Sequence, residues 1–363
     1  MITAKIIKNG KIETPTEFIS PDDYDEWMRR GLPQAGDVLL TTEAPLGEVA
    51  QLDSGKVALA QRVVAVRGKK DLLDNDFLKY LLQSREVQDQ LRSRASGTTV
   101  QGIKQSELRK INLTLPSLTE QRAIADVLGS LDDKIELNRR MNETLKAMAQ
   151  ELLEKLKKEG AGSKRLDDLV EINAQTLSKQ DALDLIEYIE ISEVSQGNIG
   201  NIQLFQRGRE PSRARRKLRH GDTVLSTVRP DRRSYFLCLN PSPNLIVSTG
   251  FAVVSPIRAP WSFIHAALTQ DEIFDYLGQQ ADGGAYPAIL PEIIGKFEIP
   301  WPSNSSVVEE FHRECGPLYA LAESNRRESR TLAELRDALL PKLLSGEIRL
   351  KPQTESSQEM PYA

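Results

Sequence analysis

The side chains that could carry out catalysis are few and far apart in this chain. Cys238 and Cys315 do not have metal-site spacing, and the three histidines (His220, His265 and His312) stand alone. The sequence also lacks a phosphate-binding Gly-rich loop with its lysine, an Asn-Pro-Pro-aromatic signature for amino-methyl transfer and a nuclease carboxylate cluster ending in lysine. We therefore expect no catalytic site and no metal site.

The residues best suited to binding a ligand are arginines, and many of them cluster in one segment. The chain has a net charge of −4, yet residues 207–219 carry seven positive side chains against one Glu. Arginine makes bidentate contacts with guanine and with phosphate, so this segment predicts contact with nucleic acid. A solvated or partner-facing surface is the alternative. The candidate DNA-binding residues are Arg207, Arg209, Arg213, Arg215, Arg216, Lys217, Arg219, Arg229, Arg232, Arg233 and Tyr235, with Arg62, Gln101 and Lys104 in the first half of the chain.

The elements that must position these residues occur twice. The segment at 36–42 (GDVLLTT) reappears at 221–227 (GDTVLST), and the segments at 77–91, 97–103, 111–117 and 144–156 match those at 263–277, 283–289, 297–303 and 331–343. The offsets stay between 185 and 187 residues, so the chain is an internal duplication. The matched loops also make Gly97, Gln101, Gly283 and Tyr286 weaker contact candidates, because glycines admit close approach of a backbone.

Each copy has the same order of predicted elements. Short β-branched segments separated by turn residues enclose a short amphipathic helix, at 77–91 and at 263–277. A long helix closes each copy; capping boxes at Ser117-x-x-Glu120 and Ser306-x-x-Glu309 predict where these helices begin. Gly160 and Gly346 stand where a glycine would end them.

The apolar positions of the long helices alternate four and three apart, which predicts a coiled-coil seam. Surface helices with a polar interruption are the alternative. Asn138 and Asn325 hold equivalent seam positions, where a buried amide can fix register. The predicted seam consists of Ile124, Leu128, Leu131, Ile135, Asn138, Leu145 and Leu152 in the first helix and Leu318, Asn325, Leu332 and Leu339 in the second.

The predicted fold is of the α+β class, with two similar β-rich α/β units separated by a two-helix antiparallel coiled coil and related by a pseudo-twofold repeat. The antiparallel direction follows from the linker at 157–164, which leads straight into the second β-rich unit. Such an object suits duplex DNA, whose faces recur every ~34 Å. A two-headed adaptor that bridges protein partners without DNA specificity is the alternative, and weak dependence of binding on salt would favour it.

The order of β-rich unit, helix, β-rich unit and helix, together with Leu115-Pro116, Glu120-Gln121-Arg122-Ala123-Ile124-Ala125 and Leu339-Leu340-Pro341-Lys342-Leu343-Leu344-Ser345-Gly346, resembles the specificity (S) subunit of type I restriction–modification systems. The resemblance implies a non-catalytic subunit that reads a bipartite, asymmetric sequence in double-stranded DNA. It also implies docking of two methyltransferase (M) subunits and, through them, restriction/translocase (R) subunits. S-adenosylmethionine, ATP and magnesium would belong to these partners, with no cofactor on this chain.

The resemblance divides the chain into five expected parts. These are a first target-recognition domain (1–117, shortened at its N-terminus), a first helical region (118–159), a second target-recognition domain (160–303), a second helical region (304–346) and a disordered tail (347–363). No run approaches the roughly 18 apolar residues of a membrane span, and the N-terminus lacks a signal-peptide core. We expect a cytoplasmic protein that does not associate with membranes.

Overall fold

The protein is described by a computed structural model, which covers residues 1–8, 10–29, 31–158, 162–284 and 286–350. The chain divides into two compact units. Unit 1 comprises Met1–Ile135 and the chain from Arg330 onward, and unit 2 comprises Glu136–Ser329. The division runs through both long helices, so each unit contains a segment of each. The units are described separately below.

Unit 1 is built on a three-stranded antiparallel sheet with the strand order β4-β3-β5. Its central strand is completely buried over Val38, Leu39 and Leu40, because helices cover it on one side and the N-terminal segment on the other. The elements are η1 (Ala4–Ile6), β1 (Ile7–Lys8), β2 (Lys11–Ile12), η2 (Pro21–Asp23), α1 (Tyr24–Trp27), β3 (Val38–Thr42), β4 (Leu46–Gln51), β5 (Val63–Val66), α2 (Asn75–Gln83), α3 (Arg85–Ser93) and α4 (Gln105–Leu108).

Unit 2 contains two four-stranded sheets, with the orders β14-β13-β16-β7 and β11-β8-β15-β12, and two two-stranded sheets, in which β9 pairs with β10 and β6 pairs with β17. Strand β13 is central in the first sheet and is buried along its whole length. The strands are β6 (Gly162–Arg165), β7 (Val170–Ile172), β8 (Leu185–Ile189), β9 (Val194–Ser195), β10 (Asn198–Ile199), β11 (Gln203–Gln206), β12 (Ala214–Lys217), β13 (Asp222–Ser226), β14 (Tyr235–Cys238), β15 (Leu245–Ser248), β16 (Phe251–Pro256) and β17 (Glu298–Trp301). The helices are η3 (Leu166–Asp168), η4 (Ile191–Glu193), η5 (Pro230–Arg232), α6 (Trp261–Leu268), α7 (Asp271–Gln279) and α8 (Glu292–Gly295).

The internal duplication is visible in the structure. The glycines that begin the GD pairs adopt matching left-handed conformations, with φ of +85° at Gly36 and +88° at Gly221. Each donates its N–H over 2.7 Å to a carbonyl, that of Leu52 in unit 1 and that of Cys238 in unit 2. The two copies therefore repeat the backbone conformation at this glycine as well as the residue type.

The short helix predicted in each copy is in fact two helices, α2 with α3 and α6 with α7. Ser84 is extended (φ −62°, ψ 147°) and its hydroxyl accepts the Val87 N–H at 3.4 Å, so it caps α3 and ends α2. Gln270 takes the same extended conformation between α6 and α7. The amphipathic period runs through the break, which is why the pattern alone predicted a single helix.

The long helices are α5 (Leu118–Lys158) and α9 (Ser306–Leu344). The first capping box is confirmed: the Glu120 carboxylate accepts the Ser117 N–H at 3.0 Å, and the Ser117 hydroxyl accepts the Glu120 N–H at 3.3 Å. The second is wrong, because Ser306 already lies in the helix and donates its N–H to the Asn304 side chain at 3.0 Å. Asn304 supplies the cap that Ser306 was expected to supply.

Of the two glycines predicted to follow the C-terminal ends of these helices, only Gly346 lies among the described residues. Gly346 has φ +74° and donates its N–H to the Leu343 carbonyl at 3.2 Å, as a glycine just beyond a helix does. Gly160 lies outside the described residues, as does the predicted tail from residue 351 onward. Ile348 and Leu350, which the sequence analysis placed in that tail, pack against the core of unit 1.

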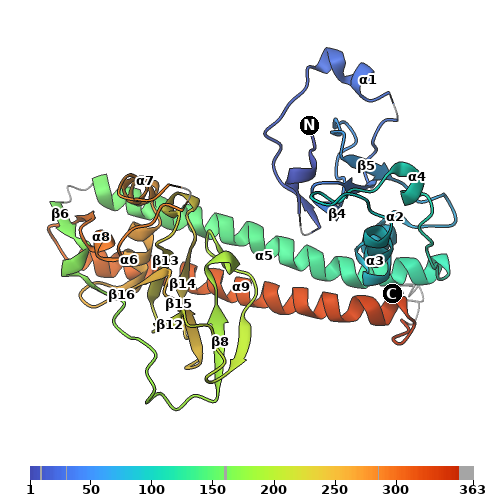
Figure 1. The fold of residues 1–363 in the computed structure, drawn as a ribbon. Coiled ribbons are helices and arrows are strands. Elements are labelled where there is room, and N and C mark those ends of the chain that lie inside the picture. Colours follow the sequence, from blue (N-terminus) through green and yellow to red (C-terminus); the bar gives the residue numbers. More distant parts are fainter. Residues whose placement is uncertain (9, 30, 159–161, 285, 351–363) are drawn as a thin grey trace, which may run out of the picture. The chain divides into compact units, whose positions relative to one another are not determined.

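Helices α5 and α9 pair antiparallel within each unit, as predicted (Figure 1). In unit 1, the carboxylate of Asp132 accepts from Arg336 at 2.8 Å. In unit 2, the amide of Asn138 donates to the Ser329 hydroxyl at 3.2 Å, and that of Asn142 to the Ala322 carbonyl at 3.1 Å. Later residues of α5 thus meet earlier residues of α9.

The predicted seam is largely buried or half-buried. The buried members are Ile124, Leu128, Asn138, Leu145 and Asn325; the half-buried members are Leu131, Ile135, Leu152, Leu318, Leu332 and Leu339. In unit 2, the adjacent residues Leu153 and Tyr319 are more deeply buried than Leu152 and Leu318. Both helices also pack against the β-rich part of the unit there, and this widens the apolar stripe beyond a strict seam.

None of the described helices combines the length and the apolar character that crossing a membrane requires.

Candidate nucleic-acid interface

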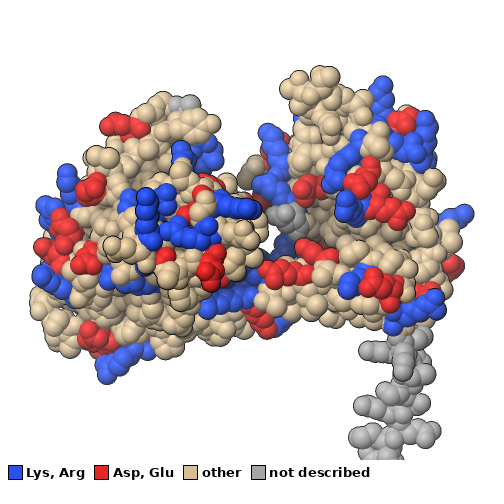
Figure 2. All heavy atoms as spheres, turned by 60° about the horizontal axis from the view of Figure 1, so that its bottom comes forward, with Lys and Arg blue, Asp and Glu red and all other residues tan. Residues whose placement is uncertain are grey.

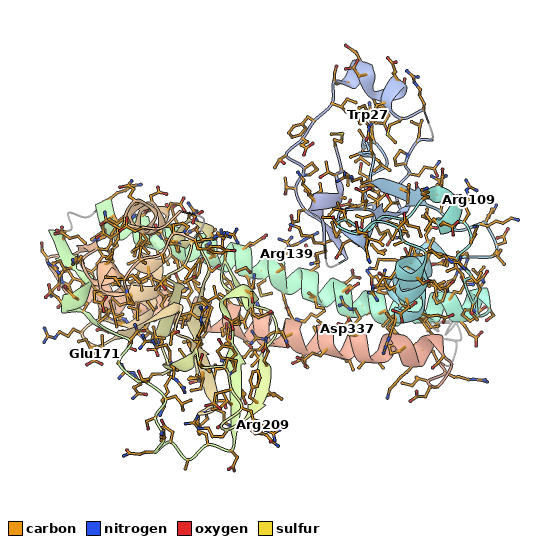
Figure 3. The ribbon with its side chains drawn as sticks, in the orientation of Figure 1. Trp27, Arg109, Arg139, Glu171, Arg209 and Asp337 are labelled. Atoms are coloured by element: carbon orange, nitrogen blue, oxygen red, sulfur yellow. The ribbon has the colours of Figure 1, made fainter. Side chains whose placement is uncertain are left out.

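The basic segment at 207–219 forms the turn after β11 together with strand β12 of unit 2. Figure 3 shows Arg209 near the lower edge of this unit. Figure 2, which brings that side forward, shows Lys and Arg side chains gathered over it with Asp and Glu among them. Strand β12 lies at the edge of its sheet, so its side chains and the preceding turn face outward in part. The structure therefore places the basic segment on a surface.

Nearby carboxylates pair with several of these cations. Glu210 forms ion pairs with Arg207 and, at 3.9 Å, with Arg215. Lys217 lies 2.6 Å from Asp181, whose pKa it lowers to about 2 by hydrogen bonding. These contacts position the basic side chains and offset part of their charge locally.

The other cations of the segment differ in environment. Arg219 forms an ion pair with Glu171 at 3.2 Å, while Arg209 and Arg213 are exposed. The Nε atom of Arg216 is buried without a hydrogen-bond partner in the described part of the chain. Arg209 and Arg213 are thus the most accessible cations of the segment.

A second group of candidates lies on the loop between β13 and β14. Arg229 and Arg233 both have left-handed backbones, with φ of 50° and 56°, and flank the short helix η5. The Arg233 side chain forms an ion pair with Asp271 at 2.6 Å. Arg232 is exposed, and the guanidinium of Arg229 lies 4.4 Å from the centre of the Tyr286 ring.

Tyr235 does not belong to this surface, which corrects the expectation from the sequence. Its side chain is only 5% exposed, and its ring stacks on Phe274 with 5.7 Å between centroids. Its hydroxyl accepts a hydrogen bond from Lys146 at 3.2 Å. Tyr235 begins strand β14 and points into the core, so its proximity to arginines in sequence was misleading.

The candidates of unit 1 gather around the end of strand β3. Arg62 forms an ion pair with Glu43 at 3.0 Å, and Glu43 pairs through its backbone with Gly102. Gln101 and Lys104, on either side of this bridge, are exposed. The structure thus brings together three residues that the sequence left scattered.

Sequence reasoning found both loops that carry Arg229 and Tyr286 but not their pairing. Residues 286–290 lie against the loop that follows β13, and Val228 and Ala288 form a backbone bridge. The available signal was the repeated glycine, which has φ +113° at Gly97 and +108° at Gly283. A repeated glycine shows that a turn is kept but does not say which segment the turn packs against.

Comparisons with known proteins agree with this architecture. Residues 2–147 match the family model described as the Type I restriction modification DNA specificity domain. The chain is 24% identical over 362 residues to the type I restriction enzyme MjaIX specificity subunit of Methanocaldococcus jannaschii, with coverage of 87% of this chain and 78% of that protein. It is 30% identical over 151 residues to the MjaVIII specificity subunit of the same organism, covering 40% of this chain and 35% of that protein.

A solved structure shares the fold. The crystal structure of a type I restriction–modification system S subunit from M. genitalium superposes with a TM-score of 0.55 at 17% identity, over 86% of this chain and 84% of that chain. Residues 2–147 thus match the type I restriction–modification DNA specificity domain, and the chain is similar over most of its length to type I restriction enzyme specificity subunits, in agreement with the resemblance found in the sequence.

Proposed function

We propose that the chain is the non-catalytic DNA-recognition subunit of a type I restriction–modification enzyme, in which each unit reads one half of a bipartite, asymmetric sequence. The observation that carries this proposal is a duplicated fold whose two copies present different side chains. Repeated turns and backbone contacts keep the scaffold the same, with offsets of 185 to 187 residues. A scaffold that is kept while its surface diverges suits recognition of two unlike half-sites.

The charge before the GD pair illustrates this divergence. In unit 2 that segment contains Arg209 and Arg213, which are exposed. In unit 1 the residues at the same offset, 22–34, contain Asp22, Asp23, Asp25 and Glu26 against Arg29 and Arg30, a net charge of −2. Phosphates attract the first surface and repel the second, so unit 2 contributes more of the electrostatic affinity for DNA.

The paired helices would dock the methyltransferase subunits and, through them, the restriction subunits. On α5, Leu137, Met141 and Met148 are exposed, by 53%, 36% and 49%. Their spacing of four and seven residues places them on one face of the helix. An exposed apolar stripe of this kind is typical of a surface that a partner covers. S-adenosylmethionine, ATP and magnesium would then bind to the partners, and the assembled enzyme would work in the cytoplasm.

The test is to co-express the chain with candidate methyltransferase subunits encoded beside it and to sequence the methylated bases of the host DNA. We expect a complex that methylates one bipartite motif. The affinity of this complex for DNA should fall by orders of magnitude between about 50 and 200 mM salt. A complex that forms but shows no motif and no dependence on salt would instead support an adaptor, and failure to form a complex would contradict the docking role.

A further inference from the structure

In unit 2 two loops are joined into one small structure beside the end of β13. The N–H of Ile289 donates to the Thr227 carbonyl at 2.9 Å, and Val228 pairs with Ala288. The loop after β13 and the loop before α8, which are far apart in sequence, thus present their side chains together.

Unit 1 repeats this arrangement. The N–H of Ile103 donates to the Thr42 carbonyl, also at 2.9 Å, and Glu43 pairs with Gly102. Each contact lies 185 or 186 residues before its counterpart in unit 2. The paired loops are therefore part of the duplicated scaffold.

The residue that follows the bridge has an unusual backbone in both copies. Ala44 has φ 45° and Arg229 has φ 50°, in the left-handed region that disfavours residues with a Cβ. In unit 2 the Arg229 N–H is held by the Pro287 carbonyl at 2.7 Å. A strained conformation that the surrounding bonds impose at the same place in both copies points to a function for that place.

The side chains at this place differ between the copies. In unit 2, Arg229 lies over the Tyr286 ring at 4.4 Å, and Tyr286 is 71% exposed. In unit 1, the corresponding residues are Ala44 and Val100, neither of which can donate a side-chain hydrogen bond. Contact with the ring restrains the guanidinium, and a restrained fork of N–H donors matches the O6 and N7 acceptors of guanine.

We propose, on the basis of the function proposed above, that the cation–π pair of Arg229 and Tyr286 is the element with which unit 2 reads a guanine base. Arg229 contacts the base, and Tyr286 is a positioning residue. The neighbouring cation Arg232 serves the phosphates, because its exposed side chain has no hydrogen-bond or ion-pair partner in the described part of the chain. The equivalent place in unit 1 presents only apolar groups, which suit the methyl group of thymine.

The test compares the methylated motif of the wild-type complex with those of single variants. Arg229→Lys keeps the charge but loses the planar fork, and we expect discrimination for guanine to fall roughly tenfold or more at one position in one half of the motif. Tyr286→Ser should relax the same position, and Tyr286→Phe, which keeps a ring, should retain the preference for guanine. Arg232→Ala should weaken binding to every sequence without relaxing any position.

The control is Arg258→Ala, which removes an exposed arginine elsewhere in unit 2. It should leave both the motif and the affinity unchanged. Thermal unfolding of each purified complex separates loss of specificity from loss of folding. A defined wild-type motif that Arg229→Lys leaves intact at every position would overturn the inference alone. If the wild-type complex has no motif, the proposed function itself fails.

Discussion

Asp132, on α5, connects this helix to α2 and α9 of unit 1 through three hydrogen bonds. Its carboxylate accepts from Lys79 at 2.9 Å, from the Tyr80 hydroxyl at 2.8 Å and from Arg336 at 2.8 Å. Burial acts to raise the pKa of Asp132, but the two neighbouring cations outweigh it and hold the pKa below its usual value. The carboxylate therefore stays ionised and ties α2 to both long helices.

We predict that Asp132→Asn lowers the free energy of unfolding of unit 1 by about 2–3 kcal/mol, because it leaves a mostly buried cation without its counter-charge. Urea unfolding of the full chain measures this loss, and hydrogen exchange of α2 in the native protein assigns it to unit 1. Asp133→Asn, an exposed neighbour, serves as the control and should have little effect. Combining Asp132→Asn with Lys79→Met should recover part of the loss, and a simple sum of the two single effects would contradict the coupling.

The surface position of charged residues could be predicted from the sequence more reliably than the environment of an aromatic residue. The arginines at 207–219 do lie on a surface, because charged side chains cannot be buried together without partners. Tyr235 was misplaced because an aromatic residue beside arginines suits either a base-stacking surface or a core. Only the packing of α7 against the β13–β14 loop, which brings Phe274 onto its ring, decides between the two.

At the scale of elements, the long helices were the most predictable part of the fold. A period of 3.5 residues and equivalent asparagines indicated their pairing, and Asn138 and Asn325 do meet: the amide of Asn138 donates to the Asn325 carbonyl at 3.3 Å. The residues that cap the helix N-termini were less predictable, because Asn304 and Ser306 are equally suitable residue types for a cap. The break at Ser84 was missed because the apolar period continues through it.

The buried asparagines should determine the register of the helix pair in unit 2. Asn138 also donates to Glu328 at 2.8 Å, and Asn325 donates to the Asn142 side chain at 2.9 Å. We predict that Asn138→Leu changes the free energy of unfolding by no more than about 1 kcal/mol, because apolar burial offsets the lost hydrogen bonds, but allows more than one register.

Spin labels at Glu143 and Ser324, exposed positions on the two helices, measure the register. The distribution of distances between them should broaden in Asn138→Leu. It should stay narrow in Ser329→Ala, which removes one hydroxyl contact only. A narrow distribution in both variants would show that apolar packing alone fixes the register.

The exposed stripe on α5 leads to a prediction about assembly. Met148→Lys should reduce copurification of the methyltransferase subunit at least tenfold, since a charge in the buried centre of an interface is left without solvent. Ala147→Lys introduces the same charge at the adjacent exposed residue, which points about 100° away around the helix. It should have little effect, and equal losses in the two variants would argue against a defined stripe.

Over the whole molecule, the two copies fill one equivalent place with different chemistry. Where unit 1 has Lys79 and Asp132, unit 2 has His265 and Tyr319, whose rings meet edge to face at 5.0 Å. His265 also contacts the Thr223 hydroxyl at 3.1 Å. Burial, together with the positive charges of Arg326 and Lys146, lowers the pKa of His265 to about 3. The same junction is thus ionic in one copy and requires a neutral ring in the other.

This difference predicts that mild acid weakens unit 2 before unit 1. The folded pKa of His265 lies below its unfolded value of about 6.5, so its contribution is complete above pH 6.5 and falls by about 2 kcal/mol by pH 5. The pKa of Asp222 is raised by burial and opposes part of this loss in unit 2. The low pKa of Asp132 keeps its contribution in unit 1 until the pH falls below about 4. Hydrogen exchange at pH 7 and pH 5 should therefore show α6 losing protection while α2 keeps it, and His265→Gln should remove the change in α6. Equal losses in both helices, or an unchanged loss in His265→Gln, would assign the acid sensitivity to other groups.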